Sequence, residues 1–126
     1  MNRDEFVEKY FNTAEKALRC SKKARREGLL ALEDEIDEEK VNERDILEYG
    51  LRFVVDGYDP EIVDQILSNI VNQEKDEQLR TLKNIQREAV LKIQEGINPN
   101  LLYALLNSFT DISLSEDRLN EDRKTV

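Results

Sequence analysis

The sequence predicts an all-α protein, an elongated bundle of three to four helices in which the first and third helices are long. Three observations carry this prediction. Apolar residues recur at three- and four-residue steps through most of the chain. Each of the two prolines follows a glycine by three residues, a spacing typical of one helix ending and the next beginning. Charged residues make up 37% of the chain, against about 25% in an average protein, which fits helices with a wide solvated face.

The first helix is predicted over residues 3–35. Phe6, Tyr10 and Phe11 supply bulk near its start, and a stripe of small residues follows, namely Ala14, Ala17, Ser21, Ala24 and Gly28. A glycine inside a helix costs about 1 kcal/mol relative to alanine, so Gly28 indicates either a close helix crossing or a kink. The acidic run at residues 33–40 is predicted to be a solvated helix end or loop, because it lacks the central glycine and ligand order of a calcium loop.

The second helix is predicted over residues 42–55, with Asn42 as its N-cap. Gly57 is expected to adopt the left-handed conformation that ends a helix. Asp59 is then expected to cap the third helix, and Pro60 to be its first residue.

The third helix is predicted over residues 60–95, although residues 72–78 are polar throughout. One long helix and two helices joined near Lys75 both fit this pattern, and we favour one helix because no glycine or proline interrupts it. Gly96, Asn98 and Pro99 repeat the stop, cap and start signals for a short helix ending near residue 109. Its apolar stretch, residues 101–106, fits either a core segment or a partner or oligomer contact.

The chain is therefore predicted to form a single helical domain over residues 1–109, followed by a flexible polar tail over residues 110–126. The longest uncharged run, residues 96–110, is 15 residues long, too short and too polar to span a bilayer. The N-terminus has no apolar segment typical of a signal peptide. We accordingly expect a cytoplasmic protein that is not inserted in a membrane.

Composition argues against an enzyme. There is no histidine and one cysteine, Cys20, which argues against common zinc sites and against Cys-His or Ser-His catalysis. We expect Cys20 to be a helix residue and not a reactive thiol, and we expect no cofactor. The net charge of -9 disfavours nucleic acid as a partner and favours a basic protein surface.

Two stretches, residues 24–33 (ARREGLLALE) and residues 50–61 (GLRFVVDGYDPE), occur in an order and at a separation that resemble the cytoplasmic region of MotA-type flagellar motor stator subunits. The resemblance covers about residues 14–72, with residues 24–72 as the stator-like core. It implies an interaction module associated with the flagellar motor, whose partner is the rotor switch protein, a stator component or a scaffold component. Because stator subunits work as rings, it also implies a possible homo-oligomer.

The resemblance implies that Arg25 is a rotor-facing residue and Glu33 the key acid, and together with Arg26 they are the predicted partner-binding residues. On one straight helix, eight residues span about 12 Å and turn about 80°, so Arg25 and Glu33 would sit apart on one broad side. A partner of reversed charge order could meet both. The alternatives are that these are ordinary exposed charges in local pairs, and that the protein is a cytoplasmic helical adaptor or regulator without a motor role. No membrane helix is predicted, so the family's ion pathway has no counterpart.

Overall fold

The computed structural model describes residues 1–112, and these residues are helical with no strand, which confirms the all-α prediction. Five α-helices and two short 3-10 helices (η) follow one another along this part of the chain. Their bounds are α1 Arg3–Glu27, η1 Leu29–Glu35, η2 Glu38–Lys40, α2 Ile46–Val55, α3 Pro60–Gln73, α4 Glu77–Glu95 and α5 Pro99–Asn107.

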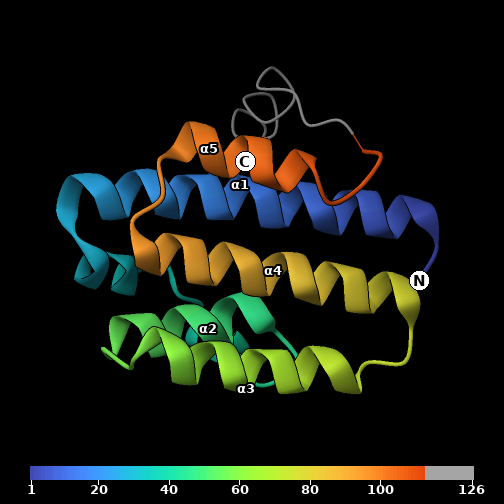
Figure 1. Cartoon of the computed structure of the whole chain (residues 1–126), viewed down its shortest axis with the longest axis horizontal. Helices are drawn as coiled ribbons and strands as arrows, with labels where there is room; N and C mark the ends of the chain where they lie inside the picture. The colour runs from blue at the N-terminus through green and yellow to red at the C-terminus, as the bar shows by residue number, and fades with distance from the viewer. Residues whose placement is uncertain (113–126) are drawn as a thin grey trace.

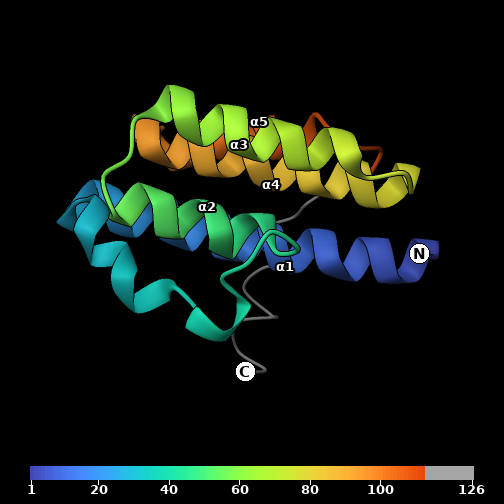
Figure 2. The same cartoon turned by 90° about the horizontal axis from the view of Figure 1, so that it is seen from below.

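Helix α4 is the centre of the bundle, and it packs against α1, α2, α3 and α5. In Figure 1 it lies between α1 on one side and the pair α2 and α3 on the other, with α5 laid along α1. All five α-helices run roughly along the long axis of the molecule, as the turned view in Figure 2 also shows. Because other helices pack around α4, it buries a stripe of apolar side chains along its length, namely Leu82, Ile85, Ala89, Val90 and Ile93.

The predicted first helix, residues 3–35, is too long: α1 ends at Glu27. Gly28 has φ +91°, a value that side-chain-bearing residues rarely adopt, and its N–H donates to the Ala24 carbonyl (2.8 Å) as the helix stops. Of the two roles considered for this glycine, a close crossing and a kink, neither applies, because it terminates the helix. The chain then folds back as η1, which buries Leu32 and packs against α1 and α2.

The predicted single helix over residues 60–95 is wrong, because the chain breaks between Gln73 and Glu77. Asp76 caps α4 by accepting from the Leu79 N–H (2.9 Å), which holds the pKa of Asp76 below its usual range. Glu74 is extended, accepts from the Asp76 N–H (3.1 Å) and pairs with Lys83 (2.9 Å), which lowers the pKa of Glu74. A capping aspartate therefore divided the helix without any glycine or proline, and neither the long third helix nor the count of three to four is confirmed.

The start of the second helix also differs from the prediction, because α2 is capped by Asp45 and begins at Ile46. Asn42 instead accepts from the Arg44 N–H (2.9 Å) in a turn that precedes the helix. The glycines and prolines that were predicted to end and begin the later helices do so. Gly57 and Gly96 have φ +83° and +82°, and Pro60 and Pro99 open α3 and α5.

Helix α5 is amphipathic, so one face of residues 101–106 belongs to the core, and the partner or oligomer contact stays a prediction. Leu102 and Leu106 are fully buried, whereas Leu101 is 61% exposed. The Tyr10 hydroxyl on α1 donates to the Leu106 carbonyl, which ties α5 to α1. Ile112, inside the predicted tail, is buried as well, and residues 113–126 lie outside the described part of the chain.

The first part of the small-residue stripe of α1 lies in the core, where Ala14, Ala17 and Ser21 are buried together with Cys20, whereas Ala24 is half-buried and Gly28 is exposed. Burial, with a smaller contribution from Glu35, raises the pKa of the Cys20 thiol to about 11. The thiol is therefore protonated near neutral pH, and its side chain has no exposure to solvent. Cys20 accordingly has the character of a small apolar core residue.

Gly50 lies where α2 packs tightly against α4. A Cβ at this position would lie 2.7 and 2.8 Å from the two methyl carbons of Val90 and 3.1 Å from Leu67 Cδ1. We expect Gly50→Ala to lower the free energy of unfolding by about 1 kcal/mol, because overpacking outweighs the gain in helix propensity. Urea denaturation measures this, and in a Val90→Ala background the same substitution should stabilise. Stabilisation in the parent protein would show that the two helices separate readily.

Candidate partner-binding end

One end of the bundle gathers the segments that carry the predicted site. Helices α1, α2 and α4 finish there, η1 lies there, and α3 and α5 begin there after short turns (Figure 1). We call this part of the molecule the bundle end. It contains both sequence stretches that resemble the stator subunits, residues 24–33 and 50–61.

The bundle end also holds every large apolar side chain that is exposed among residues 1–112. Leu30 follows the end of α1, Tyr58 lies in the α2–α3 turn, and Ile62 and Leu101 lie in the first turns of α3 and α5. Their exposed fractions are 76%, 54%, 43% and 61%, respectively. Isolated exposed apolar residues are common on any surface, but their confinement to one end indicates a surface suited to contact with another molecule.

The basic residues of the predicted site lie at the last turn of α1 and are exposed. Arg25 Nη1 donates to the Gly96 carbonyl (2.8 Å), so this cation sits at the C-terminus of α4 where it complements the helix dipole. Arg26 is 70% exposed, and its one ion pair within residues 1–112 is a long contact with its neighbour Glu27 (3.7 Å). Arg26 is therefore the more available of the two, since a guanidinium has five donors and this one uses few of them.

Glu33 does not share a straight helix with Arg25, so the predicted rod geometry is wrong. The break at Gly28 places Glu33 on η1, where it remains half exposed. Its two carboxylate oxygens accept from both terminal nitrogens of Arg52 (2.6 and 3.2 Å), a bidentate pair. This bond is the first cause of the lowered pKa of Glu33.

Arg52 is the hub of this acidic side of the bundle end. Besides Glu33, it bonds Glu38 (2.5 Å) and Asp56 (3.0 Å), and these hydrogen bonds, that to Glu33 first, raise its pKa. Three carboxylates around one guanidinium leave an excess of two negative charges. Because the pKa of Glu33 is lowered on folding, its contribution to stability is present above pH 4.5, the ordinary value, and is lost as the pH falls below it.

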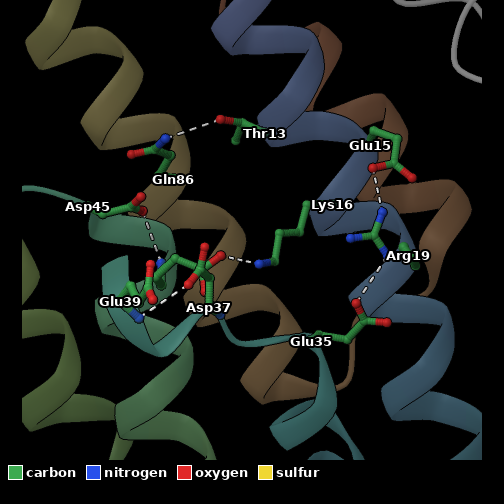
Figure 3. Close-up of polar contacts among 10 residues, drawn as sticks. Thr13, Glu15, Lys16, Arg19, Glu35, Asp37, Glu39, Asp45 and Gln86 are labelled. Atoms are coloured by element: carbon green, nitrogen blue, oxygen red, sulfur yellow. Dashed lines mark hydrogen bonds and ion pairs between the residues drawn. The ribbon is translucent and has the colours of Figure 1, made fainter. Parts of the chain in front are cut away.

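A second polar network holds η1 against the body of the bundle (Figure 3). Arg19 on α1 bonds Glu15 and also Glu35, the last residue of η1, the latter at 3.2 Å. Burial lowers the pKa of Arg19, but the bonds from Glu15 and then Glu35 outweigh this and raise it. The end of η1 is thus fixed to the same helix from which the chain departed.

Sequence reasoning named Arg25, Arg26 and Glu33 but missed Arg52, Glu38 and Leu30. The Arg52–Asp56 spacing of four residues on α2 was a visible signal for one contact of the hub. The contacts to Glu33 and Glu38 were not visible, because they depend on the fold-back after Gly28.

Among residues 1–112 there is no cluster of three His, Cys, Asp or Glu side chains that could hold a metal ion. No helix in this part of the chain is long and apolar enough to cross a bilayer. What the bundle end does present is charged groups and exposed apolar side chains, the two elements of protein recognition.

No protein-family model, curated protein or solved structure matches this chain significantly. The resemblance to stator subunits accordingly rests on the two sequence stretches alone.

Proposed function

We propose that this chain is a non-enzymatic protein-interaction module that docks on its partner through the bundle end. The observation that carries the proposal is the confinement of the exposed large apolar residues of the described chain to this end, which also carries Arg25, Arg26 and the acids bonded to Arg52. Apolar side chains supply contact area, and charges around them fix orientation and favour the correct partner.

The charge pattern defines the partner surface. Arg25 and Arg26 would pair with acidic side chains of the partner, and the acids around Arg52 would pair with a basic side chain. Leu30, which lies between these groups in sequence, would enter an apolar pocket of the partner. Such a central apolar anchor with a charged surround is the usual arrangement of an interface hot spot.

We further propose that the partner is a flagellar motor protein, and the rotor switch protein first. The Glu33–Arg52 pair joins the two stretches that resemble stator subunits, so residues of both stretches lie on one surface. The identity of the partner as a flagellar motor protein is inferred from this resemblance alone. The second candidate, a helical adaptor without a motor role, uses the same end with a different partner.

The test is isothermal titration calorimetry of the purified chain with purified rotor switch protein. We expect binding by the parent and roughly tenfold weaker binding by Arg26→Glu and by Leu30→Ser. The matched control is Lys75→Glu, which changes an exposed lysine without an ion pair among the described residues. Lys75 belongs to the connection between α3 and α4, which lies at the opposite end of the bundle (Figure 1). The control makes the same change in net charge as Arg26→Glu and should bind like the parent.

Two results would contradict the proposal at different levels. Failure of the parent to bind the switch protein, together with normal swimming of a deletion strain, would remove the motor role and favour the adaptor. Equal weakening by Arg26→Glu and Lys75→Glu would show that net charge acts and that the bundle end does not.

A further inference from the structure

A cleft of about 330 Å³ opens between the N-terminal halves of α1 and α4 and the segment that enters α2. Its walls carry an unexpected charge for a protein with a net charge of -9. Five basic side chains line it, against the two carboxylates of Asp45 and Glu48. The basic residues are Lys9, Lys16, Lys40, Arg44 and Lys83.

Both carboxylates of the cleft are already engaged within the fold. Asp45 caps α2 by accepting from the Glu48 N–H (3.2 Å). Glu48 pairs with Lys16 and accepts from the Asp37 N–H (2.9 Å). Figure 3 shows Lys16 reaching from α1 toward the start of α2, where Asp45 lies. Among the lining residues the five bases outnumber these two acids, which leaves the cleft with an excess of three positive charges.

Three of the bases have no such partner. Lys83 pairs with Glu74 (2.9 Å), but Lys9, Lys40 and Arg44 form no ion pair within residues 1–112, and all three are exposed. Lys40 of η2 and Arg44 of the loop before α2 are close in sequence, and the fold brings Lys9 of α1 to the same cleft. Like charges gathered in this way repel one another, and a bound anion would relieve that repulsion.

The rest of the lining suits a small ligand with an organic body. Leu47 and Leu82 are buried in the wall and give an apolar floor. The Gln86 amide donates to the Thr13 hydroxyl (3.1 Å), so a second amide hydrogen and the Asn12 side chain remain as donors beside the cations. The volume is at the lower limit of small-molecule pockets and is too small for a folded partner.

We propose that this cleft binds a small phosphorylated metabolite that carries two or more negative charges. Arg44 offers the planar donor pair that matches a phosphate, and Lys9 and Lys40 add compact point charges. This inference is independent of the bundle end, whose residues do not line the cleft. An acidic peptide presents the same charge in an extended form, and the experiment treats it as the competing ligand.

The experiment is calorimetric titration of the full chain at fixed ionic strength with inorganic pyrophosphate, fructose 1,6-bisphosphate and an octaglutamate peptide. We expect both phosphate compounds to bind more tightly than the peptide, and binding to weaken as salt is raised. The Lys40→Gln/Arg44→Gln variant should bind pyrophosphate roughly tenfold more weakly, because two charge-assisted contacts are lost.

The matched control is Lys22→Gln/Lys75→Gln, which removes the same charge at two exposed lysines outside the cleft. It should bind pyrophosphate like the parent, and circular dichroism checks that both variants are folded. The proposal is overturned if neither phosphate compound binds below about 1 mM. Equal weakening by the two double variants, or tighter binding of the peptide, would overturn it as well.

Discussion

Replacing Glu48 with alanine should lower the free energy of unfolding by about 3 kcal/mol, because it leaves the ammonium of Lys16 without its partner in a largely buried setting. Glu48 is 4% exposed, and it is the acid that joins α1 to α2. Its second oxygen holds the backbone N–H of Asp37 (2.9 Å), so the substitution also releases the segment between η1 and η2. Urea denaturation followed by circular dichroism measures the loss.

Two further variants separate the ion pair from simple loss of packing. Lys16→Ala/Glu48→Ala removes both charges and should cost less than the sum of the two single substitutions, because no unpaired charge remains. The control Glu8→Ala, which changes an exposed glutamate of α1, should alter stability by less than about 0.5 kcal/mol. If Glu48→Ala lowered the free energy of unfolding by less than about 1 kcal/mol, the Lys16 ammonium would have become solvated or paired with another acid.

Local signals predicted the helices well where the chain itself supplies the stop. Gly57 and Gly96 end α2 and α4, and Pro60 and Pro99 open the next helices, because glycine and proline act through their own backbone restrictions. The break after Gln73 was harder to predict. It depends on Asp76 as a cap and on Glu74 held by Lys83, contacts that form only once α4 exists.

The bundle end was predictable in part for a related reason. Exposure of Arg25 and Arg26 followed from their charge, and both are exposed at the end of α1. The partner of Glu33 did not follow, because Arg52 lies 19 residues away and reaches it only through the fold-back at Gly28. The basic cleft was not predicted, since Lys9 of α1 joins Lys40 and Arg44 only through the fold, and the chain as a whole is acidic.

Leu32→Ala should cost about 3 kcal/mol of stability and should also loosen the bundle end selectively. Leu32 is the one buried residue of η1 and has no exposure to solvent, so it anchors this short helix to the body. A seven-residue 3-10 helix has little stability of its own, and its geometry therefore depends on that anchor. Without it, Glu33 should lose its fixed position beside Arg52.

The matched control is Leu67→Ala, which removes an equally buried leucine from α3, away from η1. Both variants should lower the urea midpoint, but only Leu32→Ala should speed amide hydrogen exchange in residues 29–40 under conditions where the rest of the protein stays folded. Only Leu32→Ala should then weaken docking through the bundle end. Equal exchange in the two variants would mean that η1 is held by the Arg19–Glu35 and Arg52–Glu33 pairs, and that its apolar anchor contributes little.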